Sequence, residues 1–355
     1  MSIELRNVQK RVGVQTHIHE TNVKLERGEF NILLGTTLSG KTTLLRIMAG
    51  LERPTAGEIW YDGVDVTHVP VQKRKVSMVY QQFINYPNLT VFENIASPLR
   101  VVRAAEKEIR SKVGEVAELL DLTAMLKRMP HELSGGQQQR TALARSLTKD
   151  ADLILLDEPL ANLDYKLREE LREKLPKLFR DTGATVVYAT TEPSEALLLG
   201  GHTATLHEGR ITQYGPTSVV YREPCDLISA QVFSDPPINI AKVEKKRGRF
   251  YLGEGISWSA KNRWQELKDG EYTLGCRPHH VGLAPVNQYS VQIRGEVQIA
   301  ELSGSESTIH AKVLDKSWVA LNHGIHRFEA GEIASLFLQT DRCLIFDEEL
   351  RLMRT

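Results

Sequence analysis

Residues 35–42 read Gly35-Thr-Thr-Leu-Ser-Gly40-Lys41-Thr42 and fit the pattern G-x-x-x-x-G-K-[ST]. The two glycines let the backbone bend so that successive N–H groups face phosphate oxygens, and a helix start adds its positive end. Lys41 supplies a cation for the β- and γ-phosphates, and the Thr42 hydroxyl is a ligand for Mg²⁺. The predicted phosphate-binding residues are Gly35, Thr36, Thr37, Leu38, Ser39, Gly40, Lys41, Thr42 and Thr43.

The segments on either side of this loop support the interpretation. Phe30–Leu34 is an apolar run typical of a buried strand, and Thr42–Ala49 has a helical pattern that stops at Gly50. Strand, loop and helix are the setting that a phosphate-binding loop needs, whereas a chance glycine-rich turn needs neither neighbour. We therefore expect this loop to bind ATP with Mg²⁺.

A second apolar run, Leu153–Leu156, leads into Asp157-Glu158-Pro159. A buried strand of an α/β sheet delivers such an Asp to its carboxyl end, where these sheets bind their ligands. Asp157 can hold Mg²⁺ there, directly or through water, and Glu158 is placed to polarise an attacking water. An ordinary strand end is the alternative, and the upstream phosphate loop favours the catalytic interpretation.

The most specific string in the chain is Leu133-Ser134-Gly135-Gly136-Gln137. Its small residues would let backbone N–H groups and the Ser134 hydroxyl approach a phosphate at a helix start. A glycine-rich helix entry without a ligand is the alternative. The residues predicted to contact nucleotide here are Ser134, Gly135, Gly136 and Gln137.

The patterning of the 355 residues predicts two domains, at 1–235 and 236–355. In the first, strands alternate with helices, which favours a parallel α/β sheet covered on both faces. Helical patterning dominates residues 85–150, where one helix face is formed by Ile109, Val113, Val116 and Leu120.

The second region begins after the linker-like break Ser234-Asp235-Pro236-Pro237. It contains short alternating segments that predict a small all-β domain or a pair of barrels. These segments are Gln292–Ile299, Thr308–Val313, Trp318–Leu321 and Ile333–Leu338.

Composition excludes some classes of function. Lys+Arg and Asp+Glu both number 45, so a zero formal net charge gives no electrostatic case for nucleic acid or an anionic membrane surface. No apolar run approaches the ~20 residues that cross a bilayer, and Met1–Arg6 does not begin a signal peptide. The cysteines, Cys225, Cys276 and Cys343, are far apart, so we expect free thiols in a reducing cytoplasm.

The order of these motifs resembles the ABC ATPase family over residues 1–235. Gln81 sits where that family has a glutamine contacting Mg²⁺ and water, and Ala161-Asn162-Leu163-Asp164 looks like its D-loop, which places Asp164 at the nucleotide. Leu274–His279 and Gly295–Ile299 resemble the regulatory β domain of sugar-importer ATPases of the maltose type. The resemblance implies an α/β P-loop ABC cassette followed by a small all-β, OB- or barrel-like regulatory domain.

Two positions depart from the family pattern. A switch histidine normally follows a strand in Thr-His-Asp, but here Thr191 occupies its place in Thr190-Thr191-Glu192. The family usually has an aromatic residue near position 12 that stacks on adenine, whereas Val12 can pack but cannot π-stack. With these departures the chain resembles one member of the ATPase pairs of bacterial glycerol importers.

The resemblance implies an ATP-hydrolysing subunit, peripheral at the cytoplasmic face of the inner membrane, that powers import of a sugar or polyol, with glycerol favoured. It implies as partners two permease subunits, a second ABC ATPase in a heterodimer and, indirectly, a substrate-binding protein, with the permease contact in Phe83–Val91. Nucleic acid is not an expected partner.

Three alternatives belong to other classes. Translation or DNA-repair ABC proteins usually have tandem cassettes or a coiled-coil insertion, and this sequence has neither. Exporters often fuse the cassette to membrane helices. An ATP-sensing scaffold that does not hydrolyse ATP is favoured by Thr191 and disfavoured by Glu158.

Overall fold

A computed structural model describes residues 1–82, 84–161, 163–253, 255–260 and 264–354. The chain divides into two compact units, Met1–Ser218 and Val219–Thr355. The expected boundary at residue 235 lies further along the chain. Among the described residues, no helix is both long enough and apolar enough to span a bilayer.

The described residues of the first unit form two sheets. A six-stranded sheet has the order β10-β9-β3-β8-β7-β6, and a four-stranded antiparallel sheet has the order β2-β1-β4-β5. The strands are β1 Ile3–Val12, β2 Gln15–Leu25, β3 Phe30–Gly35, β4 Ala56–Tyr61, β5 Val64–Asp65, β6 Val76–Val79, β7 Leu153–Asp157, β8 Thr185–Thr190, β9 His202–His207 and β10 Arg210–Pro216.

Every residue of β3, β7 and β8 is buried, as expected for parallel strands covered on both faces. These strands and β6 and β9 run parallel, so the carboxyl ends of β6, β7, β8 and β3 lie side by side at one edge of the sheet. Four segments that are far apart in sequence meet at that edge, because each directly follows one of these strands.

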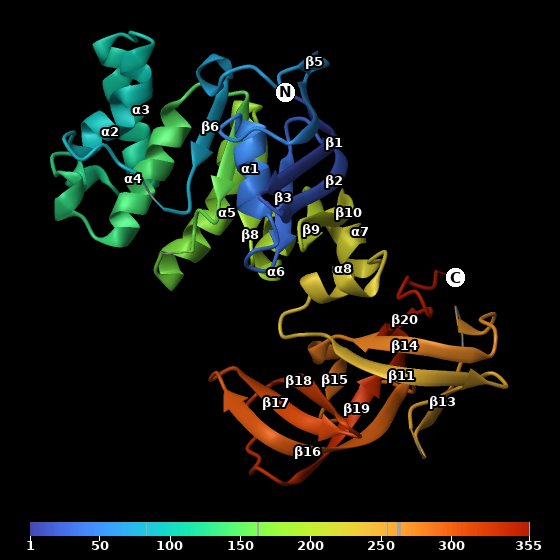
Figure 1. The fold of residues 1–355 in the computed structure, drawn as a ribbon. Coiled ribbons are helices and arrows are strands. Elements are labelled where there is room, and N and C mark those ends of the chain that lie inside the picture. Colours follow the sequence, from blue (N-terminus) through green and yellow to red (C-terminus); the bar gives the residue numbers. More distant parts are fainter. Residues whose placement is uncertain (83, 162, 254, 261–263, 355) are drawn as a thin grey trace. The chain divides into compact units, whose positions relative to one another are not determined.

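The helices of the described part of the first unit, before α7, are α1 Lys41–Ala49, α2 Val91–Val101, α3 Glu106–Leu119, α4 Gly135–Thr148, α5 Tyr165–Thr182 and α6 Pro193–Leu199. Helix α1 contacts both sheets, and its buried face joins one core with their strands. Helices α2, α3 and α4 form a group beside β6, within the span where helical patterning was predicted (Figure 1). The predicted face of α3 is buried, including Ile109 and Val113.

Helix ends follow ordinary capping chemistry. Gly50, with φ 77°, ends α1 by donating its N–H to the carbonyls of Arg46 and Ile47. The Thr90 side chain accepts the Glu93 N–H at the start of α2. Short 3₁₀ turns occur at Val71–Lys73, Thr123–Met125, Pro130–Glu132, Pro278–His280 and Thr340–Arg342.

The second unit is all-β apart from short helices. Helix α7 (Thr217–Arg222) crosses the division between the units, and α8 (Leu227–Val232) follows it. The strands are β11 Asn239–Lys246, β12 Arg249–Tyr251, β13 Ser257–Ser259, β14 Gly270–Cys276, β15 Val281–Gly282, β16 Ser290–Leu302, β17 Glu306–Val313, β18 Lys316–His323, β19 Ile333–Gln339 and β20 Leu344–Phe346.

These strands form two five-stranded sheets, β13-β12-β11-β14-β20 and β15-β19-β16-β17-β18. The edge strands β15 and β18 of the second sheet approach each other, which gives the nearly closed, barrel-like form predicted from the sequence. The two sheets share an apolar core that includes Phe250 and Trp318. Asn239 on β11 joins them by exchanging side-chain hydrogen bonds with the Val319 backbone of β18.

Candidate nucleotide-binding site

The predicted phosphate loop lies between the end of β3 and the start of α1. Gly35 has no room for a side chain, because a Cβ there would lie 2.6 Å from the Leu206 carbonyl oxygen. Gly40 has φ 104°, in the left-handed region that favours glycine. Glycine is therefore required at both positions. The loop leaves exposed the residues Thr36, Thr37 and Leu38.

Lys41 is the first residue of α1 and is buried. Its Nζ donates to the carbonyl oxygens of Gly35 and Thr36, each at 2.9 Å, and lies 3.6 Å from Glu158 Oε1. Burial lowers the pKa of Lys41, and the Glu158 carboxylate opposes that shift. The ammonium group is thus held at the loop by oxygens that a bound phosphate can replace.

Asp157 ends β7 with only 2% of its surface exposed, and its Oδ1 accepts a hydrogen bond from the Thr42 hydroxyl at 3.1 Å. Burial raises the pKa of Asp157, the hydrogen bond from Thr42 opposes the rise, and the neighbouring Glu158 carboxylate adds to it. A hydroxyl oxygen and a carboxylate oxygen side by side are ligands of the kind that Mg²⁺ binds. This pair therefore fits the cation that the sequence predicts.

Glu158 follows directly and has φ 48°, a left-handed conformation that is uncommon for a residue with a side chain. Its N–H donates to the Ala189 carbonyl on β8 at 3.0 Å, and its Oε2 accepts the Gln81 amide at 3.1 Å. Gln81 lies just past β6. The structure thus brings together the side chains of Lys41, Thr42, Gln81, Asp157 and Glu158, which were predicted to contact phosphate, Mg²⁺ or the attacking water.

Thr191 directly follows β8, next to the strand that carries Asp157, and is exposed. The nearby histidines lie on β9, where His202 Nδ1 pairs with Glu29 Oε2 at 2.9 Å and His207 is 3.9 Å from Glu208. Thr191, which the sequence analysis assigned to the switch-histidine position, therefore lies at the same edge of the sheet as Asp157.

Val12 is the last residue of β1 and is 50% exposed. It pairs with Gln15 across the hairpin, and Ile18 further along β2 lies against Gly40 of the phosphate loop. Three residues of β-strand span about 10 Å. Val12 thus lies on the β1–β2 hairpin, further from the phosphate loop than Ile18. It offers a nucleotide base only an aliphatic surface.

Ser134 caps α4. Among the described residues, the side-chain hydrogen bonds of the predicted nucleotide-contacting string Ser134–Gln137 join residues at the start of that helix. The Ser134 N–H donates to Gln137 Oε1 at 3.0 Å, and the Gln137 N–H donates to Ser134 Oγ at 3.4 Å. Gly135 and Gly136 form the first turn. These four residues are not joined to the phosphate loop of their own chain.

Asp164 caps α5 by accepting the Leu167 N–H at 3.1 Å. Asn162, in the predicted D-loop, lies outside the described residues. Sequence reasoning missed Gln139, which is buried and donates to the Pro159 carbonyl at 2.6 Å, so that α4 contacts the segment after Glu158. A polar residue on the inner face of a predicted helix was the available signal.

A phosphate loop, an Asp-Glu pair and a glutamine at neighbouring strand ends define a P-loop nucleoside triphosphatase of the α/β class. A family model described as ABC transporter matches residues 18–161. The chain belongs to the ATP-binding proteins of ABC transporters, in the group of maltose-type sugar importers. It is an ABC-type ATPase that uses ATP with Mg²⁺.

Relatives match along nearly the whole chain. The trehalose/maltose import ATP-binding protein of Thermococcus litoralis is 35% identical, covering 98% of this chain and 97% of its own. The sn-glycerol-3-phosphate import ATP-binding protein of Yersinia enterocolitica is 34% identical, covering 95% and 94%. A solved dimeric ATP-binding cassette bound to ADP and Pi is 32% identical, with a TM-score of 0.56 over 61% of this chain and 98% of that one.

Proposed function

We propose that this chain is the ATP-hydrolysing subunit of an importer for a sugar or polyol, acting at the cytoplasmic face of the inner membrane on two permease subunits. The observation that carries the proposal is the convergence of Lys41, Thr42, Asp157 and Glu158 at one sheet edge. The names of the relatives, importers of trehalose, maltose and sn-glycerol-3-phosphate, support a small polyhydroxylated cargo, and glycerol remains our favoured one.

The site residues have distinct roles in this proposal. Lys41 and the loop amides bind the phosphates of ATP, while Thr42, Asp157 and Gln81 hold Mg²⁺, which neutralises charge on the phosphates. Glu158 orients and polarises the attacking water, since its carboxylate lies beside both Lys41 and Gln81. Val12 packs against the base, and Asp164 completes the nucleotide contacts.

We further propose two unequal ATP sites in a heterodimer of this chain with a second, histidine-bearing ATPase. A substrate-binding protein would be an indirect partner of the assembled importer. Thr191 offers a shorter, uncharged donor than the imidazole it replaces. The chain's own site would turn over slowly, while Ser134–Gln137 would complete the partner's site. Losing a positioned donor to the γ-phosphate costs roughly 10²–10³ in rate. Pairing with a second copy of this chain is the alternative.

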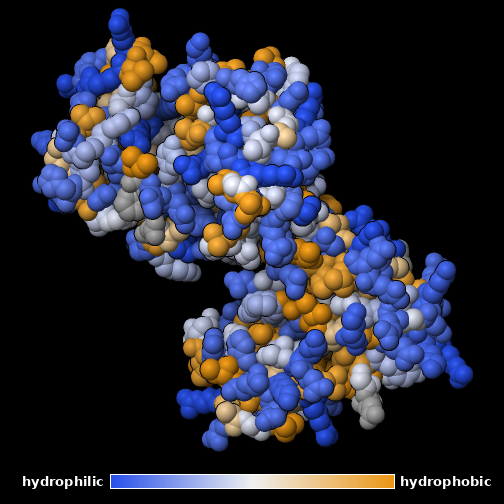
Figure 2. Space-filling view, viewed as in Figure 1, coloured by the Kyte–Doolittle hydropathy of each residue, from blue (hydrophilic) through white to orange (hydrophobic). Residues whose placement is uncertain are grey.

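A cleft in the first unit supports the permease contact. It has a volume of about 580 Å³ and lies between β6 and the helical group, with Val101 and Val102 at its rim 82% and 72% exposed. On the face of the first unit drawn in Figure 2, hydrophobic residues are scattered among hydrophilic ones. Exposed apolar residues around a cavity are typical of a docking site.

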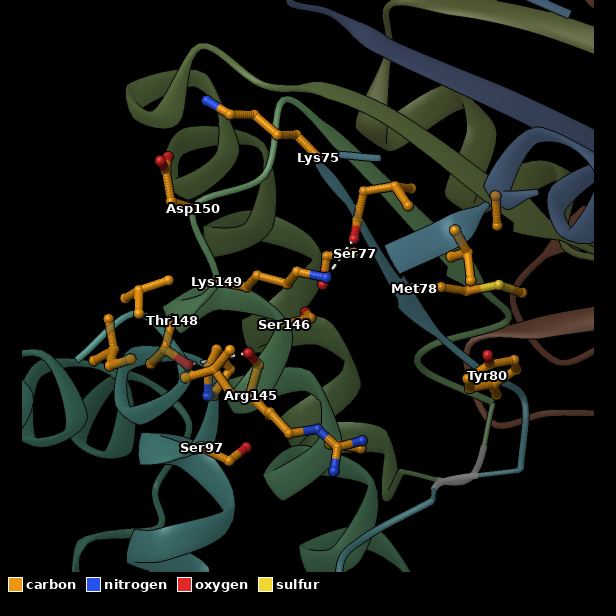
Figure 3. A pocket seen from close by; sticks show the side chains of 18 of the residues that line it. Lys75, Ser77, Met78, Tyr80, Ser97, Arg145, Ser146, Thr148, Lys149 and Asp150 are labelled. Carbon is orange, nitrogen blue, oxygen red and sulfur yellow. Dashed lines mark hydrogen bonds between the residues drawn. The ribbon is translucent and has the colours of Figure 1, made fainter. Parts of the chain in front are cut away.

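The cleft also has a basic wall (Figure 3). Arg145 donates Nη2 to the Ile84 carbonyl and stacks on Tyr86, while its Nη1 is buried with no hydrogen-bond partner among the described residues. Burial lowers the pKa of Arg145, with Tyr86 opposing the shift. Tyr86 belongs to the predicted contact segment Phe83–Val91, of which Phe83 lies outside the described residues. A permease segment with apolar residues and a carboxylate would fit this cleft.

The direct test is ATP binding by Lys41→Ala. Loss of a charged hydrogen-bond donor to phosphate should weaken Mg-ATP binding by about 1.5–3 kcal/mol in a calorimetric titration. Equal affinity of wild type and variant would refute the proposed nucleotide site. An exposed lysine on α5, Lys174, gives the matched control, Lys174→Ala.

The unequal sites are tested in the assembled transporter. Glu158→Gln in this chain should lower ATP hydrolysis modestly, whereas the matching change in the partner ATPase should nearly abolish it. Two equally inactive variants would contradict the model. An ATP-sensing scaffold, the second candidate favoured by Thr191, predicts no single-turnover hydrolysis at either site.

A further inference from the structure

A buried group of charged and hydroxyl side chains lies at the end of β8, just before Thr191. The hydroxyls of Tyr188 and Thr190 donate to Glu195 Oε2 at 3.0 and 2.6 Å. Arg172, from α5, donates to Glu195 Oε1 at 3.1 Å, and both side chains are at least nine-tenths buried. These contacts fix the end of β8 against α5 and α6. They therefore restrain the backbone next to Thr191.

Arg168 lies one turn before Arg172 on α5 and contacts two different loops. Its Nη1 donates to Glu192 Oε1 at 2.8 Å, and its Nη2 donates to the Ala161 carbonyl oxygen at 3.0 Å. Glu192 directly follows Thr191, and Ala161 lies three residues after Glu158. One planar guanidinium group therefore joins the segment that carries the catalytic carboxylate to the segment that carries Thr191.

These bonds close a ring. The Ala161 N–H donates to the Glu158 carbonyl at 3.3 Å, and the Glu158 N–H donates to the Ala189 carbonyl at 3.0 Å. From Ala189 the chain runs through Thr191 to Glu192, which returns to Arg168. A closed ring restricts its members more than an open chain does, and it supports the unusual φ of 48° at Glu158.

We propose that Arg168 is a positioning residue that sets the spacing between the Glu158 carboxylate and Thr191. The idea rests on the proposed function, because it takes Glu158 as the group that polarises water. Small displacements of such a group have large effects on rate, since the reacting atoms must be aligned. Arg168 touches no nucleotide in this proposal and acts only through the two loops.

A purely stabilising role is the competing explanation. The side chains of Arg168 and Glu192 are 23% and 37% exposed, and an ion pair so close to solvent contributes little to the stability of a fold. The bond to the Ala161 carbonyl would have no special value in that case. The two explanations differ in what they predict for local backbone motion.

The experiment compares the full-length chain with Arg168→Gln and Arg168→Lys, and uses Lys174→Gln as the control on the same helix, where Lys174 pairs with Glu170 at the surface. Hydrogen exchange is followed in the absence of nucleotide. In Arg168→Gln, the amides of Glu158 and Glu192 should exchange about tenfold faster, with the melting temperature nearly unchanged. Arg168→Lys keeps the positive charge but loses the planar guanidinium group, so its amide exchange rates should lie between those of the wild type and Arg168→Gln.

Steady-state hydrolysis gives the second readout. Arg168→Gln should lower kcat about tenfold and leave KM for Mg-ATP within about twofold, because binding is retained while alignment is lost. Unchanged exchange at Glu158 and Glu192, or exchange accelerated evenly across the unit with a lower melting temperature, would overturn the proposal. Since exchange is measured without nucleotide, its outcome does not depend on whether Lys41→Ala confirms the proposed function.

Discussion

At the scale of single residues, the metal-binding role that we propose for Asp157 opposes its contribution to stability. Its carboxylate is nearly fully buried, and burial raises its pKa above the ordinary value. A buried carboxyl group with a raised pKa favours its neutral form, so ionisation at neutral pH costs folding free energy. The same ionised carboxylate is what a metal ion requires.

We therefore expect Asp157→Asn to stabilise the nucleotide-free protein at pH 7, by about 0.5–2 kcal/mol, while removing Mg²⁺-dependent hydrolysis. Because the folded-state pKa is raised, the stability contribution of Asp157 is present in full below its unfolded pKa of about 3.9 and is lost as pH rises through the folded pKa. The advantage of the variant should thus shrink as pH falls. Thermal unfolding of both proteins at pH 7 and pH 5 measures this, and a wild type that is more stable at pH 7 would contradict it.

Thr191 provides the second residue-scale prediction. The residue is exposed at the end of β8, so an imidazole can be accommodated there. Thr191→His should raise single-turnover hydrolysis at this chain's own site by at least about tenfold, as a positioned donor to the γ-phosphate is restored. Thr191→Asn adds a polar group without an imidazole and should not. An equal rate of hydrolysis in all three proteins would show that Thr191 already acts as the donor to the γ-phosphate.

Some of the candidate site could be predicted from residue types and spacing, and some could not. Asp157 ends a buried strand, and Lys41 and Thr42 follow another buried strand after a short loop. Parallel strands bring their carboxyl ends to one edge of the sheet. Arg172 and Glu195 were not predicted, because charged residues are ordinarily assigned to the surface. They are 23 positions apart, and only the folded arrangement of α5 and α6 pairs them.

At the scale of elements, the strands most reliably predicted are those buried on both faces. Leu153–Leu156 was expected and β7 spans Leu153–Asp157. The expected segment Gln292–Ile299 was too short, since β16 runs from Ser290 to Leu302. A register shift between Val297 and Ile299 interrupts the alternation of buried and exposed residues, so pattern alone ends the strand early.

The end of α2 carries an element-scale prediction. Val101 lies at the rim of the cleft beside β6 and is 82% exposed, so Val101→Asp should leave folding and ATP binding intact. A carboxylate there would be buried against the apolar surface of a docked permease, which should weaken that contact by about 1–3 kcal/mol. Co-purification with the permeases measures the loss, and Val64→Asp, an exposed valine on β5, is the control. Undiminished recovery would place the contact elsewhere.

At the scale of the whole molecule, the structure divides the chain before α8, whereas the sequence predicted a domain boundary at residue 235. Helix α8 shares a small apolar core with Ile238, Leu344 and Phe346 of the β unit. The sequence analysis placed the boundary at the linker-like break Ser234–Pro237, which follows α8. Core membership depends on partners more than 100 residues later, which local patterning does not reveal.

This division predicts how truncated chains behave. A chain ending at Ser218 should fold and bind Mg-ATP within about threefold of the full-length affinity, because the described phosphate and metal side chains all precede that residue. A chain ending at Asp235 should bind ATP equally but aggregate more readily, since Leu227 loses its apolar partners. Titration and light scattering of both chains test this. A folded 1–218 chain without ATP affinity would assign part of the site to the β unit.

The residues around 350 determine when the β unit can be completed during synthesis of the chain. Leu350 accepts the Leu227 N–H, Leu352 donates to the Cys225 carbonyl, and β20 pairs with β14, so residues 344–352 complete the β unit. The strands of the ATPase sheet are all present by Pro216. At roughly 5–20 residues per second, a ribosome therefore finishes the β unit on the order of ten seconds after the ATPase sheet. A newly made chain therefore passes through an interval in which the ATPase sheet is complete and the β unit is not.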